Sequence, residues 1–210
     1  MSPLPRHLFD RWQHRPDPAD PARGVVYWHV LLGDEPQVRE LAATAQQRLA
    51  GFTGLHLTPL RWLHITTLVA GSTAEISDGD LKDMLAKAAL ALSSQPPVTV
   101  ELGRILYHSE AIMFAVRPAG SLSPLRAAAV QATPVVRGRP SDASGAPAAW
   151  IPHMTLCYST REQPAAPVIA ALGKELPRCK VQIEALSLVV QHGPERDWDW
   201  RVVGAAHLQG

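Results

Sequence analysis

The chain of 210 residues has little of what several protein classes require. Cys157 and Cys179 are its only cysteines, which excludes a disulfide framework and a CxxC motif and suits the reducing cytoplasm, where we expect the protein. No stretch approaches about 18 consecutive apolar residues, and the first residues lack the apolar segment of a signal peptide. We therefore expect neither export nor a membrane partner.

The chain also lacks an excess of either charge. Its formal net charge at pH 7 is +1 and its sequence pI is ≈ 7.9. A binder of duplex DNA normally carries a strongly basic face, so we expect no such partner, and a nucleic-acid substrate would be recognised locally, at an end or a single phosphate. The length suits one compact unit, which we expect to be monomeric.

What the chain does contain is a repeated triplet of histidine, apolar residue and threonine, inside two apolar, β-prone runs. The copies are His64-Ile65-Thr66 and His153-Met154-Thr155. Because side chains alternate along a strand, the histidine and threonine of each copy project from one face, about 6.6 Å apart. Both could reach one phosphate, where the ring moves a proton and the hydroxyl donates a hydrogen bond. Two such strands side by side would form a two-histidine acid–base site.

The other periodic segments alternate between strands and helices. The patterns predict strands over 25–32, 62–70, 98–107, 111–116, 150–158, 180–191 and 198–208, and helices over 36–50, 77–92, 121–133 and 167–176. Ser77 and Ser121 are expected as helix caps. A third triplet, at His56, runs straight into Pro59, so we interpret it as a strand end or turn rather than a further catalytic strand.

This order of elements predicts an α+β fold of two related lobes, with helices outside and the two motif strands meeting at a central cleft. Residues 1–24 are rich in proline and charge, which predicts an extended N-terminal arm before a single bilobal domain over 25–210. The composition of residues 134–149 predicts a long loop, which is either a flap over the substrate or a plain surface insertion.

Several further residues are candidates for substrate binding. Tyr27 and His29 share one face of their predicted strand, where they line either the cleft or the core. Arg137 and Arg139, in the long loop, are candidate phosphate contacts. Tyr158 lies on the face opposite His153 in an unbroken strand, so a role for it in binding requires a bulge or the end of the strand.

The two triplets resemble the motifs of the two-histidine (2H) phosphoesterase superfamily, whose bacterial branch is called 2′-5′ RNA ligase-like. His64 to Gly71 matches the first motif with its trailing glycine, and Pro152 to Leu156 matches the second with its preceding proline. The resemblance extends from about Val25 to Leu208. It implies a bilobal α+β fold, with two antiparallel sheets in a pseudo-two-fold arrangement around a central cleft, and neither a metal nor another cofactor.

The sequence departs from the family's pattern in two places. Thr67 stands where the first motif more often has an apolar residue, but it is expected to point away from the site. Members often have Leu-Ala-Arg after the second threonine, whereas this chain has Leu156-Cys157-Tyr158. The absent arginine removes a cation near the phosphate or RNA, which favours simple hydrolysis over the joining of RNA ends.

By this resemblance the chain is an enzyme, a cyclic phosphodiesterase that converts 2′,3′-cyclic phosphates of RNA 3′ ends or nucleotides to 2′-phosphates. His64 and His153 would be the catalytic pair, and Thr66 and Thr155 would bind the phosphate. The resemblance places His64 on the leaving ribose oxygen and His153 on the attacking water. The sequence alone does not fix which histidine is the acid.

Other functions stay open. A non-catalytic module that binds RNA ends or nucleotides would keep the same cleft, and a phosphodiesterase or ligase acting on 2′-5′ linkages or on small nucleotides would use the same residues. A metal hydrolase is disfavoured, because the sequence has neither His-x-His nor His-Glu-x-x-His.

Overall fold

The computed structural model describes residues 4–13, 15, 23–134 and 150–210. The helices are α1 (Pro36–Leu49), α2 (Asp78–Leu92), α3 (Ser123–Ala132) and α4 (Ala166–Leu172), with short 3-10 turns at Leu60–Trp62 and Glu195–Asp197. The strands are β1 (His7–Leu8), β2 (Val25–Leu31), β3 (Leu55–Leu57), β4 (His64–Ser72), β5 (Val98–Tyr107), β6 (Ala111–Ala115), β7 (His153–Ser159), β8 (Gln163–Pro164), β9 (Glu175–Ile183), β10 (Ala185–Gln191) and β11 (Arg201–His207). None of the helices in this described part is both long and apolar enough to cross a membrane.

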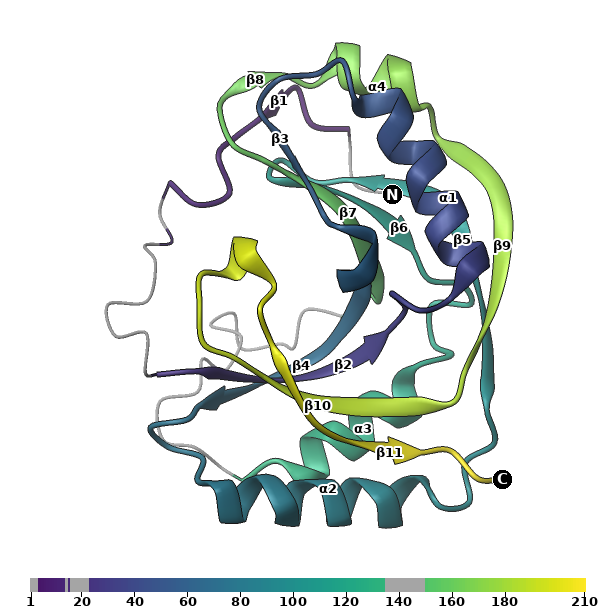
Figure 1. The fold of residues 1–210 in the computed structure, drawn as a ribbon. Coiled ribbons are helices and arrows are strands. Elements are labelled where there is room, and N and C mark those ends of the chain that lie inside the picture. The colour runs from purple at the N-terminus through teal and green to yellow at the C-terminus, as the bar shows by residue number, and fades with distance from the viewer. Residues whose placement is uncertain (1–3, 14, 16–22, 135–149) are drawn as a thin grey trace.

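Nine of the strands form one curled antiparallel sheet made of two halves, and β1 and β8 form a separate two-stranded sheet. The order of the large sheet is β11-β10-β2-β4-β7-β6-β5-β9, with β3 paired to β7. We call the strands β11, β10, β2 and β4 the β4 half, and the strands β7, β6, β5, β9 and β3 the β7 half. The two halves are bridged at Ile65 and Met154. Helices α2 and α3 cover the first half and α1 and α4 the second (Figure 1). The predicted bilobal α+β fold is confirmed, with its two sheets joined into one path.

The main core lies between the sheet and the helices, and strand alternation explains it. Val26, Trp28 and Val30 of β2 are 0 to 2% exposed and point toward the helices. Tyr27 and Leu31 of the same strand belong to a second, smaller cluster on the opposite side, which we call the inner face. The inner face is where both triplets place their histidines.

Several element boundaries differ from the prediction. The segment 180–191 is two strands, because the positions that enter the main core change from odd (Val181, Ile183) to even (Leu186, Leu188) where the chain passes from the β7 half to the β4 half. Helix α3 starts without a side-chain cap, since the Ser121 hydroxyl donates to the Pro118 carbonyl instead.

The ends of α2 and α4 follow local signals. Ser77 forms the predicted cap of α2, in a reciprocal capping box with Asp80. Helix α4 ends at Leu172 rather than at residue 176, because Gly173 adopts φ 80° and turns the chain into β9.

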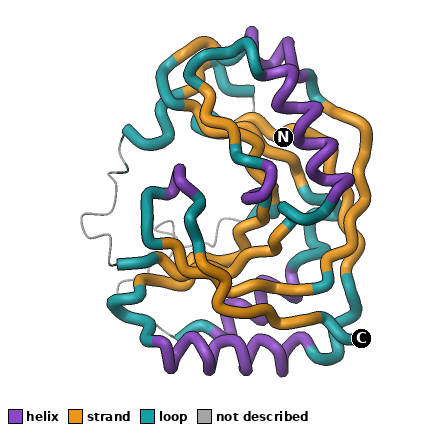
Figure 2. Tube along the Cα trace, viewed as in Figure 1, coloured by secondary structure: helices purple, strands orange, loops and turns teal. Residues whose placement is uncertain are grey.

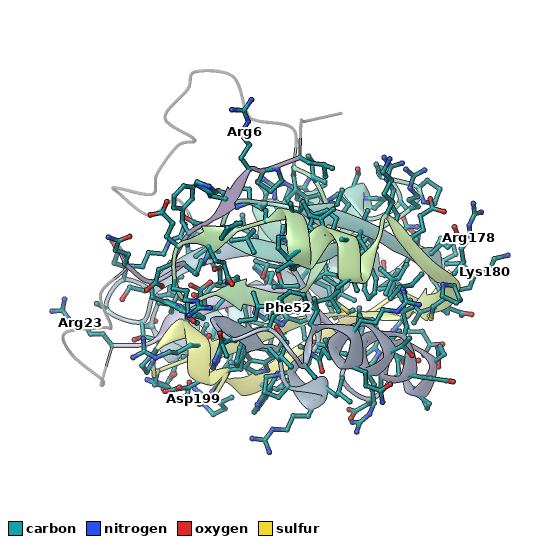
Figure 3. The ribbon with its side chains drawn as sticks, turned by 90° about the horizontal axis from the view of Figure 1, so that it is seen from above. Arg6, Arg23, Phe52, Arg178, Lys180 and Asp199 are labelled. Atoms are coloured by element: carbon teal, nitrogen blue, oxygen red, sulfur yellow. The ribbon has the colours of Figure 1, made fainter. Side chains whose placement is uncertain are left out.

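The N-terminal arm packs against the β7 half over its described residues. β1 pairs with β8, and farther along the Arg11 amide donates to the Ser159 carbonyl of β7. Leu8 is buried, whereas Arg6 projects outward, as do Arg178 and Lys180 at another edge of the molecule (Figure 3). The described part of the arm therefore runs alongside a motif strand.

Candidate active site

The two triplets meet at the junction of the sheet halves. Ile65 and Met154 are paired across this junction and are fully buried in the main core. Because antiparallel strands run in opposite directions, one step along each strand places His64 across from Thr155, and Thr66 across from His153. All four side chains therefore emerge on the inner face, with a histidine–threonine pair on each side of the junction (Figure 2 shows where the strands meet).

The backbone fixes the tautomer of both histidine rings. His64 Nδ1 lies 2.7 Å from the Trp62 carbonyl oxygen, and His153 Nδ1 lies 2.8 Å from the Ile151 carbonyl oxygen. A carbonyl can only accept, so Nδ1 carries the hydrogen in both neutral rings. Each Nε2 atom then carries a lone pair that can accept a proton, and once protonated it can donate that proton.

Aromatic rings surround His64. Its ring centroid lies 4.4 Å from that of His29 and 4.8 Å from that of Trp200. Burial in this apolar setting lowers the pKa of His64 to about 4, assisted by the charge of His153 and opposed by the hydrogen bond to Trp62 and by the charge of Glu195. The free ring is therefore neutral near pH 7.

His153 lies in a more polar setting. Burial again lowers its pKa, the hydrogen bond to Ile151 opposes that shift, and the charges of Arg11 and His108 add to it. Both histidines of the free site consequently favour the neutral form.

The threonines differ in their surroundings. Thr155 is 8% exposed, whereas Thr66 is half-buried beside His29 on the neighbouring strand. The next residue, Thr67, turns into the core, where its hydroxyl is buried with no hydrogen-bond partner among the described residues. Thr66 and Thr155 are thus the hydroxyls that lie next to the two histidines.

A bulge in β7 brings Tyr158 to the inner face. In the pairing with β6, Met113 lies opposite Thr155 but Ile112 lies opposite Cys157, so Leu156 is an extra residue. Leu156 and Cys157 are buried in the main core, and Tyr158 joins the inner-face cluster. The bulge that a binding role for Tyr158 required is therefore present, and it places Tyr158 rather than Cys157 on the side of His153.

The other predicted substrate-binding residues divide into two groups. Tyr27 and His29 lie on the inner face with ring centroids 5.1 Å apart, and burial lowers the pKa of His29 well below its usual value. His29 is 2% exposed and packs against His64, so it supports a catalytic candidate rather than facing solvent. Arg137 and Arg139 lie outside the described residues.

Two segments that were not predicted to be part of the site cover the inner face. The arm supplies Arg11 and Trp12, and the β10–β11 connection supplies Glu195 and Trp198. Trp12 packs edge-on against His56 and Tyr158, at 5.3 and 5.5 Å between centroids. Neither segment has a periodic pattern, and the only sequence signals were an isolated tryptophan in the arm and the Trp198-Asp199-Trp200 run.

The third triplet has no place among the catalytic candidates. His56 lies on β3, where its Nε2 contacts the Arg196 carbonyl at 3.1 Å and its ring stacks on Trp198 at 5.0 Å. Among the residues that the structure describes, no three His, Cys, Asp or Glu side chains are grouped to hold a metal ion.

Comparisons with known proteins agree with this geometry. No curated protein matches the chain. Solved structures with the same fold include TT0787 of Thermus thermophilus (20% identity, TM-score 0.60, covering 89% of this chain and 98% of that one). E. coli LigT complexed with 3′-AMP has 14% identity and a TM-score of 0.63, covering 90% of this chain and 99% of LigT. The family model of the 2′-5′ RNA ligase superfamily matches residues 34–195, which include both triplets, and the chain belongs to that superfamily.

Proposed function

We propose that the chain is a metal-independent phosphodiesterase that hydrolyses 2′,3′-cyclic phosphates of RNA ends or nucleotides to 2′-phosphates. One observation carries the proposal. The Ile65–Met154 bridge sets a histidine from each half of the sheet on the same face, and each ring is anchored through Nδ1. Two Nε2 atoms are thereby available for the two proton transfers that the hydrolysis needs.

The reaction follows from this arrangement. Water attacks phosphorus, a new P–O bond forms, and the bond from phosphorus to the ribose O3′ breaks. His153 accepts the proton of the water at Nε2, and protonated His64 gives its Nε2 proton to the departing O3′. Thr66 and Thr155 donate hydrogen bonds to the non-bridging oxygens, where charge accumulates in the transition state. Proton exchange with solvent then resets the pair.

The protonation of His64 depends on the substrate. Burial disfavours its cation in the free site, where its pKa is about 4. A bound phosphate places negative charge beside both rings, which raises their pKa values and favours a proton on one of them. We therefore propose that the substrate anion helps to charge the acid that cleaves it.

The substrate class is supported by structures with the same fold. E. coli LigT has been crystallised with 3′-AMP, with ATP and with NADP+. Each of these is a nucleotide, and an inner face lined by Tyr27, Tyr158 and tryptophans suits a nucleobase. We propose a nucleotide or an RNA 3′ end bearing a cyclic phosphate as the substrate.

A product analysis tests the proposal. Adenosine 2′,3′-cyclic phosphate and a short RNA ending in a cyclic phosphate are incubated with the protein in EDTA, and the products are separated from standards of both isomers. We expect the 2′-phosphate alone. Release of the 3′-phosphate, or no turnover of either substrate, would contradict the proposal.

A further inference from the structure

The connection between β10 and β11 crosses from the β4 half of the sheet onto the β7 half. In Figure 1 it is the yellow loop that rises from these two strands toward the other half. We call residues 192–200 the strap. Two hydrogen bonds hold its shape, from Gln191 Nε2 to the Pro194 carbonyl at 2.8 Å and from the Gly193 amide to Asp199 Oδ1 at 3.3 Å. The strap is therefore tied to itself at its base and extends over the inner face.

Trp198 seats the strap on the β7 half. Its ring lies nearly parallel to that of His56, with centroids 5.0 Å apart and an interplanar angle of 7°, and 6.3 Å from that of Tyr158. His56 and Tyr158 are cross-strand partners of β3 and β7, so their rings lie side by side. Trp198 is 3% exposed and adopts φ 48°, a conformation that is uncommon for a residue with a side chain. The buried ring thus accompanies an unfavourable backbone.

His56 also holds the backbone of the strap. Its Nε2 lies 3.1 Å from the Arg196 carbonyl oxygen, and because a carbonyl can only accept, Nε2 donates. The N-terminal arm adds two contacts. Trp12 packs edge-on against the ring of His56, and Arg11 Nη2 lies 2.8 Å from Glu195 Oε1. The strap is therefore fastened to β3 and to the arm, neither of which belongs to its own half of the sheet.

Trp200 returns the strap to the β4 half and packs on a catalytic candidate. Its ring centroid lies 4.8 Å from that of His64, at an interplanar angle of 77°, and 4.7 Å from that of Trp62. Trp62 supplies the carbonyl that accepts the Nδ1 hydrogen of His64. Trp200 thus contacts both the ring and the residue that orients it.

A single residue, Asp199, separates the two tryptophans, so the seat of Trp198 on one half constrains where Trp200 lies on the other. We propose that His56 is a positioning residue of the active site, which fastens the strap through Trp198 and thereby holds Trp200 against His64. The catalytic consequence rests on the proposed function, in which His64 must aim Nε2 at the departing O3′. The third triplet thereby acquires a role without being catalytic.

Proton NMR tests the proposal without any need for turnover. Nuclear Overhauser cross-peaks between the ring protons of Trp200 and His64, assigned with Trp200→Phe and His64→Gln, should be present in the wild type. His56→Ala removes the seat, and Trp198→Asn removes the seated ring with a residue that tolerates positive φ. Both substitutions leave in place the two rings of the contact, and each should weaken the cross-peaks. Wild-type intensities in both variants would overturn the proposal.

The matched control is another histidine of the same region of the sheet. His207 is exposed and stands at the far end of β11 from the strap. His207→Ala should keep the cross-peaks and the wild-type kcat. His56→Gln retains a donor for the Arg196 carbonyl and should lie between the wild type and His56→Ala. Circular dichroism and melting curves establish that each variant is folded.

Kinetics on a cyclic phosphate then measure the coupling between seat and strap. His56→Ala and Trp198→Asn should each lower kcat, by up to about 10²-fold, with a smaller change in KM, because His64 is misplaced rather than lost. The double variant should lose no more than the more damaged single variant, since both substitutions break the same contact. Losses of the two single variants that multiply in the double variant would overturn the proposal.

The two readouts separate this proposal from the proposed function. Turnover by the wild type with an unchanged kcat in both single variants would sink the positioning role of His56 alone. Absence of turnover by the wild type, together with the predicted loss of cross-peaks, would sink the proposed function and leave His56 as the residue that fastens the strap against His64.

Discussion

Ile65 faces Met154 across the one residue pair that bridges β4 and β7, both strands lying wholly within the described residues. Both side chains are 0% exposed and packed in the main core. Their neighbours on each strand must therefore emerge on the inner face, where they form the two histidine–threonine pairs. The buried contact behind the site thus sets the distance between the two rings in front of it.

This contact predicts that a substitution leaving a cavity between β4 and β7 reduces catalysis. Met154→Ala should lower the free energy of unfolding by about 2–5 kcal/mol, because it leaves a cavity, and should lower kcat because β7 can shift against β4. Met154→Leu conserves volume and should cost less than about 1.5 kcal/mol. Urea unfolding and turnover measure both quantities. A destabilised Met154→Ala protein with wild-type kcat would show that the junction does not set the geometry.

The two inner-face threonines should matter to the transition state. Thr66→Val and Thr155→Val each remove one hydrogen-bond donor to the phosphoryl oxygens, so each should lower kcat by about 10²–10³-fold, with a smaller change in KM. Thr67→Val is the matched control, because that hydroxyl is buried in the core and makes no hydrogen bond within the part of the chain that the structure describes. It should keep kcat and leave stability unchanged or slightly higher. Equal losses in all three variants would contradict the assignment.

The pH dependence follows from the depressed pKa values. The proposed mechanism requires one neutral and one protonated histidine in the free protein, and burial lowers the pKa of both rings, that of His64 to about 4. The singly protonated pair is therefore populated on the acid side of about pH 6.5, and kcat/KM should fall as the pH rises above that value. The fall in kcat should occur at a higher pH than the fall in kcat/KM, because bound phosphate raises the pKa values of both histidines. A kcat/KM that increases between about pH 6.5 and 8 would contradict this predicted pH dependence.

The roles of the histidines can be separated by the leaving group. A good leaving group such as p-nitrophenolate needs no proton, so a nucleotide p-nitrophenyl ester should partly rescue the variant that lacks the acid. We expect His64→Ala to lose less activity on this ester than on the cyclic phosphate, and His153→Ala to lose the same on both. Rescue of His153→Ala instead would exchange the two roles.

Much of the fold and of the site could be predicted from the sequence, because both depend on local periodicity. His64 and His153 each lie in an alternating apolar run, and the capping signal at Ser77 fixed the start of α2. The assignment of the chain to the 2′-5′ RNA ligase superfamily, suggested by the two triplets, is confirmed by the family model.

What could not be predicted depends on contacts between distant segments. The bulge at Leu156 arises in the pairing of β7 with β6, and it reverses the faces of Cys157 and Tyr158. Arg11 and Glu195 are 184 positions apart and come from segments with no periodic pattern. Only the folded sheet brings them together over the motif strands.

The most direct measurement of the central claim is the turnover of nucleoside 2′,3′-cyclic phosphates in EDTA by the wild type, His64→Ala and His153→Ala. We expect the wild type to release 2′-phosphates, and each variant to be slower by about 10²–10⁴-fold with an unchanged circular dichroism spectrum and melting temperature close to the wild type. A folded variant that retained near-wild-type turnover would show that its histidine takes no part in proton transfer, and the two-histidine mechanism would be wrong.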